Sequence, residues 1–172
     1  MQLNQLISQT TLQTIGNTPI VKLQKIVPEG SADILVKLEY FNPTGSYKDR
    51  MALSMIEEAE KRGDLQPGMT VVEYTGGSTG SSLAFVCAVK GYPFKAVTSN
   101  AFAAEKIQTM KAFGAEVILV TSESGKTTPD LIPRMMERAR SLAESEDAYF
   151  TNQLHNPDII VGHRGIGREL LQ

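Results

Sequence analysis

The chain has 172 residues, of which 41% are hydrophobic and 21% are charged, and its formal net charge at neutral pH is -2. This length predicts one domain or two small ones, and the near-neutral charge gives no reason to expect nucleic acid or an anionic membrane as a partner. No apolar run is long enough to span a bilayer, the opening residues lack the pattern of a signal peptide, and the lone Cys87 cannot form an internal disulfide. We therefore expect a cytoplasmic protein.

The first predicted elements are two strands and a helix. The segments 19–23 and 33–40 are short, apolar and alternating, which is typical of strands. A proline and a glycine then interrupt the pattern. A helix follows, because apolar residues recur at helical spacing between Met51 and Ala59, and Gly63 is predicted to end it.

The start of this helix carries a lysine. Ser46 is predicted to be the N-cap and Asp49 its capping-box partner, which puts Lys48 in the first turn. Burial on the apolar face and the positive helix end would both favour an uncharged amine, which can react with an aldehyde. The alternative is a side chain whose stem lies on apolar surface while its ammonium reaches solvent. Taken alone, the segment favours this alternative.

From residue 69 onward, predicted strands alternate with predicted helices. The strands are 69–74, 94–99, 116–120 and 148–151, and the helices are 78–90, 102–113 and 128–145. This alternation predicts an α/β fold with a parallel twisted sheet flanked by helices. The helix at 78–90 is apolar nearly all round, so we expect it to be buried on more than one side. Thr128 and Pro129 are predicted to be the N-cap and first residue of the last of these helices.

A glycine-rich turn, 75–80, joins a predicted strand directly to a predicted helix. Its three glycines allow a sharp turn and close approach to a ligand, and the free amides of the helix start suit a phosphate or a carboxylate. It is not a Walker A loop, because no lysine follows the last glycine, and Thr75 occupies the first glycine position of the dinucleotide fingerprint. From the turn alone, an anion site and a tight turn without a ligand are equally supported.

A reactive lysine and a carboxylate cradle in one α/β chain together indicate pyridoxal phosphate (PLP) chemistry on amino acids. The segments that carry both features resemble the cysteine synthase and cystathionine β-synthase family of fold-type II PLP enzymes. They are IGNTPIVKL (15–23), LEYFNPTGSYKDRMALSMIEEAEKRGDLQPG (38–68), VVEYTGGSTGSSLAFVCAVKGY (71–92) and TMKAFGAEVILV (109–120). The resemblance runs from about Ile15 to the last residues, and the lysine segment matches in order, spacing and neighbours.

The resemblance implies a role for each candidate site residue. Lys48 would hold PLP covalently and later move the α-proton of the substrate, and Ser78 would also contact the cofactor. The substrate α-carboxylate would be gripped by the turn and by Gln153, and Asn156 falls on an asparagine of the same segment. The turn residues are Thr75, Gly76, Gly77, Ser78 and Thr79.

The implied activity is PLP-dependent β-replacement or β-elimination on an amino acid with a β-leaving group, such as cysteine synthesis from O-acetylserine and sulfide. One alternative on the same fold is a cysteine desulfhydrase or a serine/threonine deaminase-like lyase. Another is a non-catalytic domain that binds a ligand or a partner protein. The resemblance also implies a homodimer, and no metal, nucleic acid or membrane partner is expected.

The chain departs from the family at two places in the turn, which usually reads Thr-Ser-Gly-Asn-Thr-Gly. Gly76 replaces the serine, and Ser78 replaces an asparagine that bonds the phenolic oxygen of the cofactor. We therefore expect substrate choice, and even reaction type, to differ from ordinary cysteine synthase.

Family members also continue further, with a second glycine-rich loop for the PLP phosphate and a Ser or Thr at the pyridine nitrogen. We therefore expect a C-terminally truncated chain that is weak or inactive alone. Residues 1–50 would open the large cofactor domain, 51–152 would form the small substrate-binding domain, and 153–172 would return toward an incomplete large domain.

The remaining residues with reactive side chains are given structural roles. Cys87 is predicted to be a packed small hydrophobe and Tyr47 a packing residue. His155 and His163 stand eight positions apart without companion cysteines, so we expect them to be structural or to face solvent.

Overall fold

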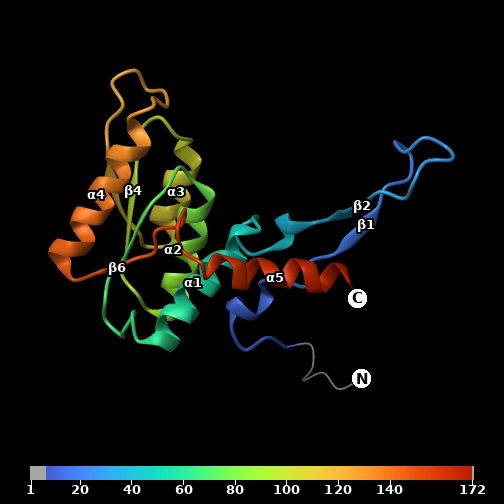
Figure 1. The fold of residues 1–172 in the computed structure, drawn as a ribbon, viewed down its shortest axis with the longest axis horizontal. Coiled ribbons are helices and arrows are strands. Elements are labelled where there is room, and N and C mark those ends of the chain that lie inside the picture. Colours follow the sequence, from blue (N-terminus) through green and yellow to red (C-terminus); the bar gives the residue numbers. More distant parts are fainter. Residues whose placement is uncertain (1–6, 172) are drawn as a thin grey trace.

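The computed structural model describes residues 7–171 and has an α/β body with an arm projecting from it (Figure 1). The body contains four parallel strands in the order β5-β4-β3-β6. They are β3 (Val71–Tyr74), β4 (Phe94–Thr98), β5 (Glu116–Leu119) and β6 (Tyr149–Phe150). The predicted α/β class and parallel sheet are confirmed, and each predicted strand of the body is present.

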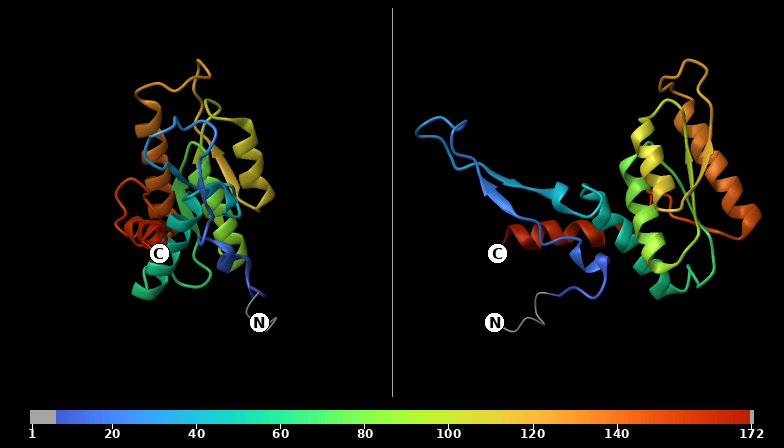
Figure 2. Two further views of the ribbon diagram at one scale, coloured as in Figure 1. Left: turned by 90° about the vertical axis from the view of Figure 1, so that its right-hand side faces the viewer. Right: turned by 180° about the vertical axis from the view of Figure 1, so that it is seen from behind.

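Helices cover both faces of this sheet (Figure 2). One face packs against α1 (Lys48–Arg62), α2 (Ser78–Lys90) and α3 (Ala104–Ala112), and the other packs against α4 (Leu131–Glu146). Successive strand residues point to opposite faces, so Val71 enters the first core while Val72 and Tyr74 enter the second. Nine consecutive buried residues of α2, from Thr79 to Cys87, confirm that it is covered on more than one side.

The arm combines segments from the two ends of the chain. Strands β1 (Ile20–Lys22) and β2 (Leu35–Lys37) form an antiparallel hairpin, shorter than predicted, and the 3-10 helices η2 (Thr11–Thr14) and η3 (Glu39–Phe41) flank it. Helix α5 (Ile159–Leu170) runs beside this hairpin and packs on α1 (Figure 1). Among residues 7–171, no helix is both long and apolar enough to cross a membrane.

The predicted start of α4 is wrong. Residue 128 is not the N-cap; its carbonyl accepts the amide of Leu131 at 3.1 Å, and Asp130 is the last residue before the helix. The chain therefore makes a turn at 128–131 before the helix begins. Pro133 then falls in the first helical turn, where a missing amide hydrogen leaves no carbonyl unpaired.

The capping box predicted for α1 is also wrong. The N-cap is Tyr47, one residue after the predicted Ser46, and the helix begins at Lys48; it ends before Gly63 as expected. The Ser46 hydroxyl accepts the Lys48 amide at 3.1 Å, so Ser46 does cap one amide. The Asp49 carboxylate, however, accepts the amide of Thr44 at 2.8 Å and the Thr44 hydroxyl. The preceding turn, with Gly45 at a φ of 74°, folds Thr44 back within reach of the carboxylate.

Candidate functional site

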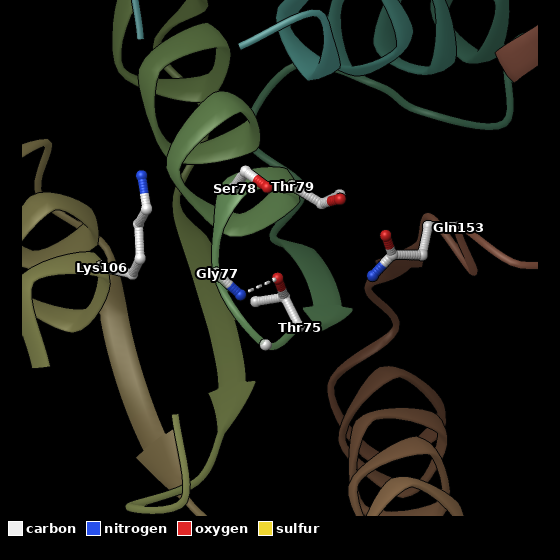
Figure 3. Close-up of a pocket in the computed structure, with 7 residues that line it drawn as sticks. Thr75, Gly77, Ser78, Thr79, Lys106 and Gln153 are labelled. Carbon is white, nitrogen blue, oxygen red and sulfur yellow. Dashed lines mark hydrogen bonds between the residues drawn. The ribbon is translucent and has the colours of Figure 1, made fainter. Parts of the chain in front are cut away.

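The glycine-rich turn lies at the carboxyl end of β3 and lines a pocket of about 390 Å³ (Figure 3). Gln153 lines the same pocket from the segment that follows β6, and Lys106 lines it from α3. The structure therefore brings together the six residues predicted to bind the substrate and adds Lys106, which the sequence reasoning missed. The six are Thr75, Gly76, Gly77, Ser78, Thr79 and Gln153.

Thr75 supplies the side-chain cap of α2. Its buried hydroxyl oxygen accepts the amide of Gly77 at 3.1 Å and the amide of Gly80 at 3.0 Å. The first amides of a helix have no intrahelical carbonyl to bond. Because Thr75 binds the Gly80 amide, the amides of Ser78 and Thr79 are the ones left at the positive end of the helix, beside the pocket.

Two glycines of the turn are needed because neighbouring side chains occupy the space of a β-carbon. A β-carbon on Gly76 would lie 2.9 Å from the ring of Phe102. One on Gly80 would lie 2.5 Å from Cγ2 of Thr75 and would also overlap Met110. The expected departure at Gly76 thus has a physical counterpart, since the Phe102 ring stands where the family serine would be.

Gln153 is held by β3 through both its backbone and its side chain. Its amide nitrogen donates to a carboxylate oxygen of Glu73 at 2.8 Å, and its Nε2 donates to the carbonyl of Tyr74 at 2.8 Å. Asn152, with a φ of 46°, makes the tight turn that brings Gln153 to this strand. One Nε2 hydrogen and the Oε1 atom are left for the pocket.

Asn156 is brought to the same segment but not to the pocket. Its Nδ2 donates to the carbonyl of Thr151 at 2.9 Å, and its Oδ1 accepts the amide of Asp158 at 2.9 Å. Both bonds close the turn between β6 and α5, so Asn156 shapes the segment that carries Gln153.

Lys106 stands on the opposite side of the pocket from Gln153 (Figure 3). A β-carbon on Gly77 would lie 3.2 Å from Cγ of Lys106, so the lysine stem rests against the turn. In the part of the chain that the structure describes, its ammonium has no hydrogen bond or ion pair. Topology was the signal that could have found it, because the segments after parallel strands β3 and β4 meet at one edge of the sheet.

Lys48 lies at the start of α1 and does not line the pocket. Its side chain is half-buried, with Nζ 4.7 Å from the ring centroid of Tyr47, and it has no hydrogen-bond acceptor among residues 7–171. The turn before Lys48 does reach the helix of the glycine turn, because the hydroxyls of Thr44 and Ser82 are 3.2 Å apart. The structure therefore brings the two helix starts together and leaves the amine outside the pocket.

His163 of α5 lies beside the lysine segment. Its ring centroid is 5.4 Å from that of Tyr47, and its Nδ1 is buried with no hydrogen-bond partner among the described residues. Burial, and then the positive charges of Lys48 and Arg50, lower the pKa of His163. His155, in contrast, is exposed. The two histidines thus differ, and His163 is a half-buried neighbour of Lys48.

Cys87 is packed in α2, as predicted. It is fully buried, and burial, with a smaller effect from Glu60, raises the pKa of its thiol to about 12. Such a thiol is not ionised at neutral pH, so it is not a nucleophile. Across the described residues, no group of three or more His, Cys, Asp or Glu side chains could hold a metal ion.

The fold and the pocket define an α/β protein with backbone amides and a lysine side chain around a pocket at the carboxyl edge of a parallel sheet. A family model described as "Pyridoxal-phosphate dependent enzyme" matches residues 11–172. The chain belongs to this family of pyridoxal-phosphate dependent enzymes, and the predicted resemblance is confirmed.

The curated relatives are cysteine synthases. Cysteine synthase B of Salmonella typhimurium is 47% identical over 158 residues, which cover 90% of this chain and 49% of the relative. Cysteine synthase of Staphylococcus aureus (strain Mu50) is 42% identical over 161 residues, which cover 93% of this chain and 50% of the relative. The chain spans about half the length of the curated relatives it matches.

Solved structures of similar proteins confirm the predicted fold type. A cysteine synthase from Entamoeba histolytica has a TM-score of 0.86 at 34% identity, covering 99% of this chain and 50% of the other. An O-ureido-L-serine synthase has a TM-score of 0.85 at 39% identity, covering 96% of this chain and 50% of the other. The α/β arrangement of parallel sheet and flanking helices is therefore that of the fold-type II PLP enzymes.

Proposed function

We propose that this chain carries the substrate-binding pocket and the reactive lysine of a PLP-dependent enzyme that acts on an amino acid with a β-leaving group. The reaction is β-replacement or β-elimination, as in cysteine synthesis from O-acetylserine and sulfide. The observation that carries the proposal is the pocket at the glycine-rich turn, whose lining residues suit a carboxylate.

The donors of the pocket match the two oxygens of a carboxylate better than the larger shell of a phosphate. Thr75 already binds the amides of Gly77 and Gly80, so the helix start offers the amides of Ser78 and Thr79 to a ligand. A carboxylate has two oxygens for these two amides, and the positive end of the helix favours its charge. Lys106 on one side and the free Nε2 hydrogen of Gln153 on the other add donors around the same anion.

The residues at the start of α1 fit an aldehyde cofactor. The Lys48 Nζ atom lies 4.7 Å from the centroid of the Tyr47 ring and makes no hydrogen bond or salt bridge with any described residue, which leaves it available to a cofactor. Lys48 would hold PLP through this amine, and the hydroxyl of Ser78, at the first position of α2, would meet the cofactor. When bound, PLP supplies an electron sink that stabilises negative charge at the substrate α-carbon.

The chain itself contributes orientation and proton transfer. The turn and Gln153 hold the substrate carboxylate, which fixes the direction of the bond between the α-carbon and its hydrogen. Lys48 takes the α-proton as a general base once its amine is free. Thr75 and Thr79 are both buried, which supports a fixed position of the turn.

The identity of the leaving group is the open choice within this proposal. The printed names of the relatives include cysteine synthase, O-ureido-L-serine synthase and a hydrogen sulfide-producing enzyme from Fusobacterium nucleatum. The last, at 38% identity and a TM-score of 0.83, keeps a desulfhydrase-type lyase as the second candidate. The ring of Phe102 fills the space next to Gly76, at the position where the family turn usually has a serine. This difference supports a change in substrate preference.

We propose the same roles for the chain segments as the sequence suggested. Residues 51–152 form the small substrate-binding domain, supported by the position of all four parallel strands within this range. Residues 1–50 and 153–172 belong to the cofactor domain, supported by the ion pair between Lys37 of β2 and Glu169 of α5. A homodimer and a cytoplasmic location stay predictions.

The test is to add PLP to the purified chain, reduce with borohydride and map the modified lysine by mass spectrometry. A pyridoxyl group on Lys48 that is absent from Lys48→Arg supports the proposal, and Lys106→Arg is the matched control with an unpaired lysine nearby. Modification spread evenly over exposed lysines such as Lys61 contradicts it. Product analysis with O-acetylserine, with and without sulfide, then separates replacement from elimination.

A further inference from the structure

Glu73 is a fully buried carboxyl group directly behind the pocket, in the strand that leads into the glycine-rich turn. Its solvent-exposed fraction is 0%. Among residues 7–171, no lysine, arginine or histidine bonds it. A buried carboxylate without a cation is costly unless hydrogen bonds satisfy it. The proposed function above gives Glu73 no role.

The carboxylate oxygens of Glu73 are the acceptors in all three of its side-chain hydrogen bonds. Oε1 accepts the amide of Tyr74 at 2.8 Å, and Oε2 accepts the Thr151 hydroxyl at 2.6 Å and the Gln153 amide at 2.8 Å. An ionised carboxylate can accept all three bonds, whereas a protonated one carries an O–H that needs an acceptor of its own. If Oε2 is protonated, the Thr151 hydroxyl can turn toward the carbonyl of Val72, 3.3 Å away, and accept the new O–H, which leaves Oε2 a poorer acceptor for the Gln153 amide. The ionised form of Glu73 is therefore the form that best binds the Gln153 amide.

Two of these donors belong to the segment that carries the pocket residue Gln153. Thr151 and Gln153 lie on either side of Asn152, whose left-handed conformation turns both toward Glu73. The neighbouring carbonyl, that of Tyr74, holds the Gln153 side chain at 2.8 Å. Glu73 and Tyr74 thus fix the backbone and the side chain of Gln153 at the pocket wall.

We propose that Glu73 is a positioning residue for the carboxylate pocket: its ionised form holds Gln153 at the pocket wall, and protonation releases it. The pocket therefore binds carboxylates more tightly when Glu73 is ionised. The inference deepens the proposed function, because it rests on the turn and Gln153 binding the substrate carboxylate.

The equilibrium between the two forms lies in the neutral pH range. Burial raises the pKa of Glu73 to about 7, and the bonds from Thr151, Gln153 and Tyr74 act in the opposite direction. The titratable neighbour on its own strand is Tyr74, whose pKa is raised by burial and then by Glu73. A small change in pH near neutrality thus changes the charge of Glu73.

The elements packed around Glu73 bring no charge that would replace this control. Strand β4 places Ala96 opposite Glu73, and the turn after β6 places the neutral Thr151 and Gln153 there. On α1, which covers the same side of the sheet as Val71, the buried ionisable groups are Asp49 and Arg50. Thr44 binds the first, and the carboxylates of Glu39 and Glu169 bind the second.

The first measurement follows Glu73 and Gln153 directly by NMR of the full chain. The carboxyl carbon of Glu73 and both amides of Gln153 are recorded between about pH 5.5 and 8.5. We expect the Gln153 amides to shift with the same midpoint as the Glu73 carboxyl, near pH 7. Gln153 amides that stay unchanged while Glu73 titrates would overturn the proposal.

The second measurement titrates propionate, a carboxylate without an amine that stays ionised over this range. Its dissociation constant is read from the amides of Gly76, Gly77 and Ser78. We expect roughly five- to tenfold tighter binding at the alkaline end than at the acid end, the effect of one hydrogen bond. Equal affinity at both ends overturns the inference, and absence of propionate binding at any pH overturns the proposed function instead.

Variants separate positioning from a merely structural effect. Glu73→Gln should bind propionate weakly and independently of pH, and it keeps both histidines as an internal control. Thr151→Val removes one bond to the carboxylate, so both midpoints should move upward by up to about one pH unit. Thr151→Ser keeps the hydroxyl and should keep the midpoints. Should Glu73→Gln fail to fold, the Thr151 pair decides, because midpoints that do not move in Thr151→Val contradict the proposal.

Discussion

The carboxylate of Glu73 in the body and those of Glu39 and Glu169, which bond Arg50, have opposite surroundings. Where α1 meets the arm, Arg50 is 5% exposed and bonds Glu39 at 2.7 Å and Glu169 at 2.6 Å, while Lys37 adds a second cation at 2.6 Å from Glu169. In the body, Glu73 has hydrogen-bond donors but no cation. The hydrogen bonds from Arg50 lower the pKa of Glu169 to about 2, whereas burial raises that of Glu73 to about 7.

The two sets of carboxylates therefore differ in how their charge responds to pH. The Arg50 network stays ionised at every physiological pH and ties η3, α1 and α5 together, so it serves the architecture. Glu73 can gain or lose its proton near neutrality, and it touches the segment that lines the pocket. A carboxylate with a cation beside it therefore stays ionised and stabilises the fold. A carboxylate with neutral hydrogen-bond donors alone can change its charge near neutral pH.

The largest effect is expected from Arg50→Met. The substitution removes a buried cation and leaves the partly buried carboxylates of Glu39 and Glu169 beside each other with Lys37 alone, which costs about 3–5 kcal/mol of the free energy of unfolding. Urea denaturation at pH 7 measures this loss. Arg134→Met, which breaks an exposed pair between α4 and Asp130, the residue before the helix, is the control and should cost less than about 0.5 kcal/mol. Equal losses in both variants would remove the basis of the comparison.

The next effect concerns the pH dependence contributed by Glu73. Its pKa is raised from 4.5 to about 7, so between these values the folded chain keeps a proton that the unfolded chain has released. The free energy of unfolding then falls as pH rises through this window, by about 3 kcal/mol in total. Glu73→Gln lacks this term. Its stability relative to wild type, from urea denaturation at several pH values, should therefore rise between pH 4.5 and 7, and a flat difference would count against the buried charge.

Glu169→Gln tests the opposite window in the arm. The pKa of Glu169 is lowered from 4.5 to about 2, so its stabilising effect is complete above the first value and is lost as pH falls toward the second. At pH 7 the variant should lose about 2 kcal/mol, the contribution of a hydrogen bond to a charged group. Acid titration followed by circular dichroism should show less loss of stability below pH 4.5 than wild type. An unchanged acid profile is the result that would contradict this.

The smallest effect on stability is expected from Lys106→Gln. Its ammonium has no ion pair with any described residue, so removal should change the free energy of unfolding by less than about 0.5 kcal/mol. The affinity for propionate, measured by NMR, should nevertheless fall by roughly two- to fivefold because the pocket loses its cation. Lys106 would then contribute to ligand affinity and not to the free energy of unfolding, whereas Arg50 contributes to the free energy of unfolding.

The sequence predicted the fold well because its signals are local and periodic. Apolar runs bounded by glycines predicted α2 with the bounds that the structure has, and the alternation of strands and helices predicted the parallel sheet. The failures occurred at helix starts. Asp49 bonds Thr44 and not Ser46, because the fold of the preceding turn decides which donor is nearest, and sequence spacing does not contain that information.

The site was predicted in part, for a similar reason. The turn was found from its glycines and its place before a helix, and Gln153 was found through the family resemblance; the structure brings them together in one pocket. Lys106 and Glu73 were missed because their roles come from neighbours distant in the sequence. A charged residue inside the apolar strand at 71–74 was the available signal for Glu73, but its partners lie 78 and 80 positions further along the chain.

Gly162 of α5 has a mechanical consequence for the lysine segment. A β-carbon there would collide with the carbonyl of Arg50 and lie 2.7 Å from Oγ of Ser54, so α5 rests directly on the backbone of α1. About two turns further along α5, the carboxylate of Glu169 accepts a hydrogen bond from the guanidinium of the same Arg50. The two helices are therefore in contact at two points, and these contacts oppose sliding of one helix along the other. Both contacts are made to Arg50, so they fasten α5 to the first turn of α1, two residues from Lys48.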